Sequence, residues 1–125
     1  MPDTTHPPSG HYPKPAAVHK LDLEAAADRL AATLPGHGRR SENLAREAGI
    51  SLVMMVMEAG DTIDEHSADG VVIVHTLRGQ LALTVAGEKS ELRPGQLALL
   101  QPGVPHGLSA RKQSVVILTI AGGEA

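Results

Sequence analysis

From residue 41 onward, the chain consists of short apolar runs separated by glycine and proline turns. Many short runs at nearly regular spacing are typical of an antiparallel sandwich or barrel, because each run is long enough for a strand but short for a helix. The predicted strands are Ile50 to Met57, Val71 to Leu77, Leu81 to Val85, Lys89 to Leu92, Leu97 to Leu100, His106 to Ala110 and Ser114 to Ile120. The sequence therefore predicts an all-β domain.

Residues 41–47 would also tolerate a helix. We predict a strand there, because Ala48-Gly49 can form a hairpin turn into the next run. The one convincing helix covers residues 21–34, where Asp22 can cap the start and Pro35-Gly36 ends the helix. Its apolar residues recur on one face, which favours packing against the outside of a barrel over binding a partner.

Residues 1–18 contain five prolines in the first fifteen positions and are predicted to be a flexible arm, ordered only against a partner subunit if at all. A single domain is then expected over residues 19–125.

The chain has no Cys, Phe or Trp, and its net charge is −3 without a basic stripe. This composition excludes thiolate chemistry and argues against nucleic-acid binding. No apolar run reaches the length of a membrane span, so we expect a cytoplasmic protein without membrane contact.

Two histidines, His66 and His106, flank the four predicted strands between residues 71 and 100. An antiparallel barrel brings such distant side chains to one interior point. His66 follows Gly60 after five residues, and Gly79 comes later in the same segment. His106 follows Gly95 through Gln101-Pro-Gly103 and two further residues. These spacings, over roughly residues 41–120, resemble the two motifs of the cupin superfamily in its small single-domain form, which implies a jelly-roll β-barrel.

In cupins, two histidines and a glutamate of the first motif and the histidine of the second commonly hold one divalent metal ion. Here Ala68 and Val72 occupy two of those ligand positions, so the resemblance implies only His66 and His106 as ligands of Fe, Mn, Ni or Zn. A stable site usually needs a third protein ligand. His75 is the candidate on the same strand as Val72, although strand alternation turns it to the other face unless a bulge intervenes. Glu65 is a weaker candidate.

The same alternation predicts a mostly apolar ligand pocket. Its expected lining comprises Met55, Met57, Val72, Val74 and Thr76, with Gln101 as a further polar contact.

Two functions remain open: a metal-dependent enzyme, such as a dioxygenase or isomerase-like cupin, and a non-catalytic module that binds or senses a small molecule. The resemblance also implies a homodimer, and the apolar strands leave sheet edges that need to be covered.

Overall fold

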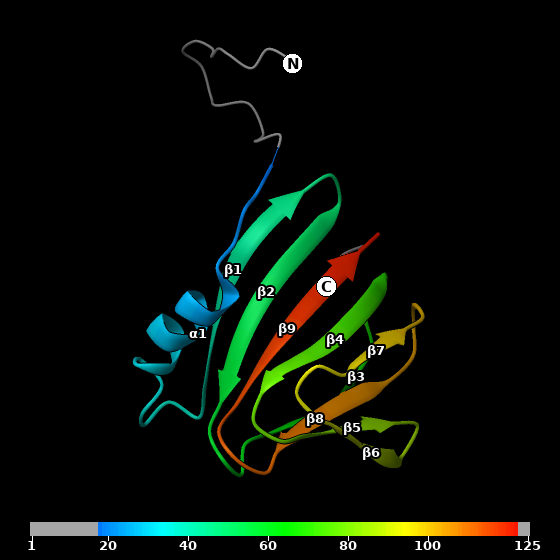
Figure 1. Ribbon diagram of the computed structural model, residues 1–125. Helices are drawn as coiled ribbons and strands as arrows, with labels where there is room; N and C mark the ends of the chain where they lie inside the picture. The colour runs from blue at the N-terminus through cyan, green and yellow to red at the C-terminus, as the bar shows by residue number, and fades with distance from the viewer. Residues whose placement is uncertain (1–17, 123–125) are drawn as a thin grey trace, which may run out of the picture.

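The computed structural model describes residues 18–122, in which one helix and nine strands follow each other along the chain (Figure 1). The predicted arm lies almost entirely outside these residues. The helix is α1 (Leu23–Ala31). The strands are β1 (Arg39–Glu47), β2 (Ile50–Met57), β3 (Thr62–His66), β4 (Val71–Arg78), β5 (Leu81–Val85), β6 (Glu88–Leu92), β7 (Leu97–Leu100), β8 (His106–Ala110) and β9 (Ser114–Ala121).

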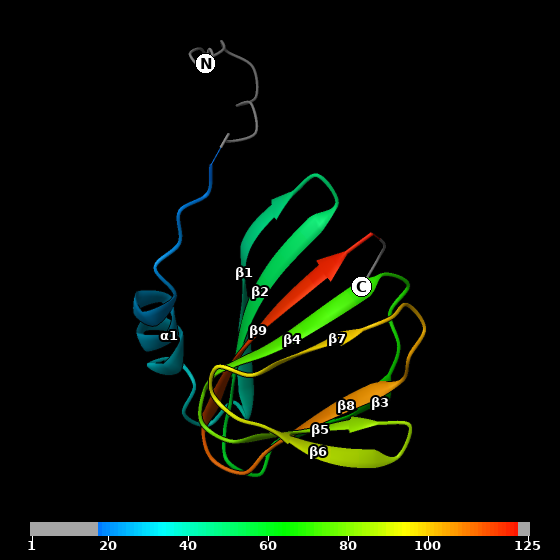
Figure 2. The same cartoon turned by 45° about the vertical axis from the view of Figure 1, so that its right-hand side comes forward.

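The strands form two antiparallel sheets that face each other as layers (Figure 2). The five-stranded sheet has the order β1-β2-β9-β4-β7, and the four-stranded sheet has the order β3-β8-β5-β6. Strands distant in sequence are neighbours in both sheets: β2 and β4 flank β9, and β3 and β5 flank β8. The prediction of a mostly β, antiparallel fold with one helix is confirmed.

The five-stranded sheet buries apolar side chains on both of its faces. Met55 and Met57 of β2 point into the core between the sheets, whereas Met54 and Val56 point outward against α1. This alternation explains why β2 is apolar from Leu52 to Met57, because a strand covered on both sides has no solvent face. The outer cluster also contains Val115 and Ile117 of β9. The helix therefore packs on the outside, over one half of the sheet.

Helix α1 begins where the sequence indicates but ends earlier than predicted. The Asp22 carboxylate accepts a hydrogen bond from the Ala25 N–H at 3.0 Å, as an N-cap does. Regular helix stops at Ala31, and Leu34 is nevertheless buried in the outer cluster. Arg78 at the end of β4 donates hydrogen bonds to Glu24 and Asp28 of α1. No helix within residues 18–122 is long and apolar enough to cross a membrane.

Strand β3 was not predicted, because Thr62-Ile-Asp-Glu-His66 has no apolar run. It forms because its backbone pairs with β8.

The turn between β4 and β5 requires glycine at position 79, and only the folded structure shows the reason. A Cβ there would lie 2.3 Å from the Ser114 Oγ and 2.4 Å from the Gln113 carbonyl oxygen, and its φ is +93°. Only glycine fits this turn between β4 and β5.

Candidate functional site

The site is centred on His66 and His106, which are directly opposite each other across the β3–β8 ladder. Their ring centroids lie 4.7 Å apart, and the ring planes are inclined by 50°. His66 is the last residue of β3 and is exposed, whereas His106 is the first residue of β8 and is only 6% exposed. The pair therefore spans from the solvent side of the site to its buried wall.

A β-bulge in β3 creates this pairing. Thr62 opposes Ser109 and Ile63 opposes Leu108, so a regular ladder would place Glu65 opposite His106. One extra residue between Ile63 and His66 shifts the register and places His66 there instead. Because side chains alternate between faces, this shift decides which side chain of β3 meets His106.

Two features hold the bulge in place. Gly107 lies beneath it, and a Cβ at that position would be 2.7 Å from the Ile63 carbonyl oxygen and 3.2 Å from the Glu65 nitrogen. The missing side chain allows the β3 backbone to pass this close. The Glu65 carboxylate also accepts a hydrogen bond from the Gly87 N–H at 3.1 Å, which ties the bulge to the turn between β5 and β6.

Arg39 of β1 anchors the start of β3. Its Nε donates to the Asp61 Oδ2 at 2.8 Å, and its Nη2 donates to the Asp61 Oδ1 at 3.1 Å and to the Thr62 carbonyl at 3.0 Å. The hydrogen bond to Asp61 raises the pKa of Arg39 above its ordinary value. The guanidinium therefore stays charged throughout the neutral range, and its planar fork suits this two-oxygen contact.

Backbone carbonyls select the same tautomer for both imidazoles. The His66 Nδ1 lies 3.2 Å from the Asp64 carbonyl oxygen, and the His106 Nδ1 lies 2.9 Å from that of Val104. A carbonyl can only accept, so each Nδ1 carries the hydrogen. Within the described part of the chain, neither Nε2 has a hydrogen-bond partner in the protein. In the neutral form of each ring, Nε2 therefore has a lone pair that can accept a hydrogen bond from a ligand.

Both rings line a cavity of about 230 Å³ between the two sheets. Apart from the histidines, the lining is apolar. It consists of Met55, Ile63, Ala68, Val72, Val74, Gly107, Leu108, Leu118 and Ile120. An apolar cavity with a few polar atoms on one wall is typical of a small-molecule binding site.

The comparisons with known proteins agree with this architecture. Residues 53–121 match the family described as the Cupin domain. The chain belongs to the cupin family. None of the curated proteins matches this cupin.

Solved structures share its fold at low sequence identity. A conserved protein of unknown function from Streptococcus pyogenes is 25% identical with a TM-score of 0.63, covering 70% of this chain and 76% of that one. KdgF from a Halomonas species is 21% identical with a TM-score of 0.67, covering 72% and 85%. Salicylate 1,2-dioxygenase from Pseudoaminobacter salicylatoxidans is 15% identical with a TM-score of 0.72, covering 81% of this cupin but 32% of that larger chain.

The structure brings some of the predicted pocket residues together and separates others. Met55, Val72 and Val74 line the cavity with the two histidines. Met57 and Thr76 are fully buried but are not part of the lining, and Gln101 is exposed outside it. Ile63, Ala68, Leu108, Leu118 and Ile120 were not predicted as lining residues. The alternation that selected Val72 and Val74, if extended along β9, would have found Leu118 and Ile120.

His75 is half-buried on the face of β4 opposite Val72 and Val74. A bulge does interrupt β4, but it lies between Thr76 and Arg78, after His75. The alternation from Val72 to Thr76 is therefore intact. His75 pairs with Leu97 of β7 and is not part of the cavity wall.

A resident divalent ion does not fit the donor set of this cupin. No group of three or more His, Cys, Asp or Glu side chains within residues 18–122 is arranged to hold a metal. Glu65 is engaged with the Gly87 N–H, and the family's ligand positions at Ala68 and Val72 carry methyl groups. Two imidazoles fall short of the three protein ligands that even an open catalytic site normally supplies.

Proposed function

We propose that this cupin binds a small, mainly apolar organic molecule in the cavity between its sheets, without a resident metal ion. The molecule carries a hydroxyl or a similar hydrogen-bond donor that donates to the Nε2 of one of the two imidazoles, His66 or His106. The observation that carries this proposal is the contact of each Nδ1 with a backbone carbonyl, because it leaves the Nε2 of each ring, in its neutral form, as an acceptor for a molecule in the cavity that both rings line.

The size of the cavity limits the ligand. A dry, apolar cavity of about 150 Å³ is known to hold benzene. The volume of about 230 Å³ in this cupin therefore suits a single ring with one or two small substituents, or an aliphatic molecule of similar bulk. The lining is aliphatic, so burial of apolar surface rather than ring stacking supplies most of the binding free energy. The imidazoles orient the ligand, because its donor group would otherwise be buried without a partner.

The experiment compares phenol, benzyl alcohol and toluene as probes in the presence of EDTA, with thermal denaturation as the readout. We expect all three to raise the melting temperature, because a ligand that binds only the native state stabilises it. The two hydroxyl compounds should stabilise more than toluene. Removal of the accepting imidazole, by His66→Ala or His106→Ala, should abolish this difference, whereas His75→Ala, on the other face of β4, should retain it.

A second measurement separates the proposal from a metal-dependent enzyme. Elemental analysis of the purified cupin, and titration with Fe, Mn, Ni and Zn, should give no stoichiometric ion. A tightly held ion that is lost in His66→Ala and His106→Ala would favour the enzyme instead. Absence of any probe binding in the metal-free protein would also overturn the proposal.

A further inference from the structure

The apolar wall of the cavity continues beyond the cavity onto β2. Leu118 and Ile120 of β9 line the cavity, and they lie opposite Val53 and Ser51 of β2, respectively. Residues directly opposite each other in an antiparallel pair share a face, so Val53 and Ser51 also lie on the inner face of the sheet. All four residues are half-buried. Their partial exposure agrees with Figure 2, in which the β1–β2 hairpin extends beyond the smaller sheet.

A β-bulge in β1 places Arg46 on this same inner face. Asn43 opposes Val53. A regular ladder would then pair Ala45 with Ser51 and turn Arg46 to the outer face. The register shift that follows Asn43 pairs Arg46 with Ser51 instead. Bulges often re-aim a side chain next to a binding site, and the bulge in β3 has the same effect on the histidine pair.

The guanidinium of Arg46 is directed toward β2. Its Nε donates a hydrogen bond to the Ser51 Oγ at 3.2 Å. Within residues 18–122, Arg46 makes no ion pair, and its two Nη atoms have no hydrogen-bond partner. In contrast, Arg29, Arg39 and Arg78 each bind a carboxylate of this chain. The terminal N–H groups of Arg46 are therefore available to a ligand.

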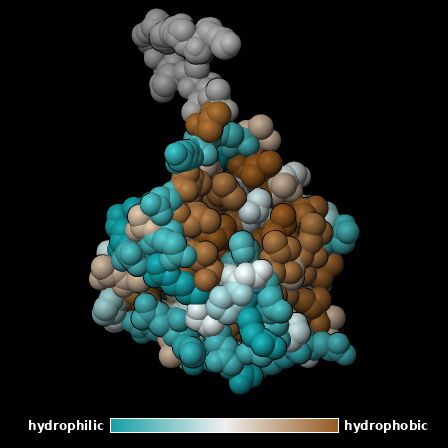
Figure 3. All heavy atoms as spheres, viewed as in Figure 1, coloured by the Kyte–Doolittle hydropathy of each residue, from teal (hydrophilic) through white to brown (hydrophobic). Residues whose placement is uncertain are grey.

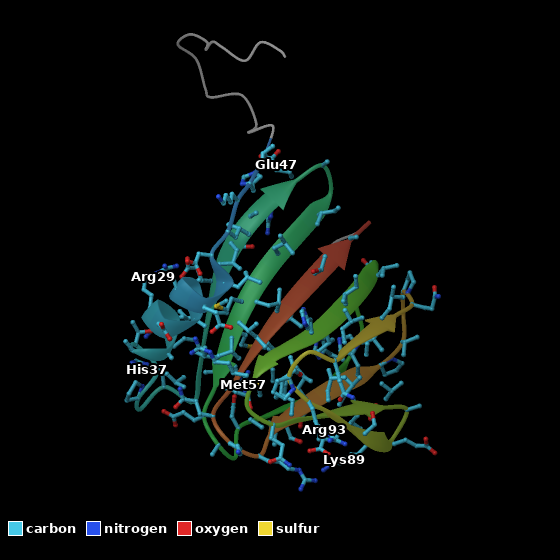
Figure 4. The ribbon with its side chains drawn as sticks, in the orientation of Figure 1. Arg29, His37, Glu47, Met57, Lys89 and Arg93 are labelled. Atoms are coloured by element: carbon cyan, nitrogen blue, oxygen red, sulfur yellow. The ribbon has the colours of Figure 1, made fainter. Side chains whose placement is uncertain are left out.

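The acidic neighbour of Arg46 in the sequence points away from it. Glu47, labelled in Figure 4 at the hairpin end of β1, pairs with Ile50, and its carboxylate lies 3.0 Å from the His19 Nε2. Figure 3 shows hydrophilic and apolar surface meeting at this end of the molecule. Neighbouring strands lie about 4.8 Å apart, so β1 is about 10 Å from β9 across the sheet. A molecule that occupies the cavity and extends over β2 therefore reaches Arg46.

We propose that the molecule bound in the cavity carries a carboxylate, which Arg46 binds at the hairpin end of the cavity. This inference rests on the function proposed above and narrows the ligand to an amphipathic organic acid. Its ring or short chain fills the cavity, its hydroxyl donates to an imidazole, and its carboxylate lies over β2. The two Nη atoms suit this group, because parallel N–H donors match the two carboxylate oxygens. Arg46 thus determines specificity for an acid over a neutral molecule of the same shape.

The experiment compares 3-(4-hydroxyphenyl)propanoate with its amide, 3-(4-hydroxyphenyl)propanamide. The two probes share the ring, the hydroxyl and the length, and they differ in the charge at the far end. Calorimetric titration in EDTA at low ionic strength measures both affinities, and phenol reports on the cavity alone. We expect the carboxylate to bind about tenfold more tightly than the amide. Added NaCl should reduce this preference, because salt screens an exposed ion pair.

Substitutions on β1 assign the preference to one side chain. Arg46→Gln should bind the two probes equally, whereas Arg46→Lys, which keeps the charge but not the planar fork, should retain part of the preference. Arg40→Gln is the matched control, because Arg40 is exposed on the same strand but pairs with Val56, whose side chain is in the outer cluster. This variant should retain the full preference. Circular dichroism verifies that each variant is folded, and the Arg46 Nε–H resonance should shift with the carboxylate but not with the amide.

The outcomes separate this inference from the proposed function. Equal affinity of the wild-type protein for both probes overturns the role of Arg46, and so does a preference that survives Arg46→Gln or is lost in Arg40→Gln. If phenol binds and neither larger probe does, the inference is overturned and the proposed function stands. If phenol does not bind either, both are overturned.

Discussion

His66 and His106 are cross-strand partners because β3 contains one residue more than β8 between their paired positions. The bulge brings their ring centroids to 4.7 Å, and the carbonyls of Asp64 and Val104 orient each ring by its Nδ1. The site thus depends on backbone features of two strands, and substitutions of residues other than the two histidines should alter it.

Gly107→Ala should destabilise the protein and separate the two imidazoles. The new methyl group would lie 2.7 Å from the Ile63 carbonyl oxygen, which is backbone and cannot rotate away. Overpacking of this kind typically costs about 1–3 kcal/mol. Urea denaturation measures the loss, and Ser109→Ala on the same strand is the control. Equal stability of Gly107→Ala and the wild-type protein would show that the bulge has room to move.

Glu65→Ala should weaken ligand binding more than it weakens the fold. It removes the acceptor of the Gly87 N–H and so releases the bulge that positions His66. Because Glu65 is exposed, we expect a change in the free energy of unfolding within about 1 kcal/mol. Phenol affinity and the imidazole ¹⁵N shifts of His66 should change, and Glu65→Gln, which keeps an acceptor oxygen, should restore both. Glu88→Ala, another exposed carboxylate substitution, should leave them unaltered.

Thr76→Val should stabilise the protein. The Thr76 side chain is fully buried, and its Oγ1 has no hydrogen-bond partner among residues 18–122. Replacing this hydroxyl by a methyl group of similar size removes a desolvation cost of about 1–3 kcal/mol and leaves no cavity. The comparison is Thr33→Val, where the Oγ1 donates to the Leu30 carbonyl at 2.8 Å and the substitution should not stabilise. A lower melting temperature for Thr76→Val would indicate that the hydroxyl binds buried water.

Arg39→Ala should destabilise the protein more than Arg29→Ala. Arg39 makes three hydrogen bonds to Asp61 and Thr62, and the Asp61 side chain is only 15% exposed. Arg29 makes one ion pair with Glu42, and both side chains are well exposed. Exposed pairs contribute little to stability, whereas loss of one partner leaves a half-buried carboxylate unpaired. Urea denaturation of both variants should rank them in this order, and a reversed order would exclude Arg39 as the anchor of β3.

Strand positions were predictable wherever an apolar run is bounded by turn residues. The bounds of β2, β5, β7 and β8 are those expected from the apolar runs and the turns between them. β3 was missed because its residues are polar and its pairing comes from β8. The same limit applies to the pocket. Thr76 shares the face of Val72 and Val74 but lies outside the lining, because alternation gives the face of a residue and not its depth.

The sequence by itself determined that this chain forms short antiparallel strands with one outer helix, because the spacing of apolar and turn residues is local information. Only the tertiary structure decided that a bulge in β3 sets the pairing of His66 with His106, that the bulge in β4 comes after His75 and leaves the predicted alternation intact, and that β7 is the sheet edge without charges. Each of these depends on which strands become neighbours and in what register. A one-residue shift in register reverses the faces of a strand, and the contacts that set it come from residues far away in the chain.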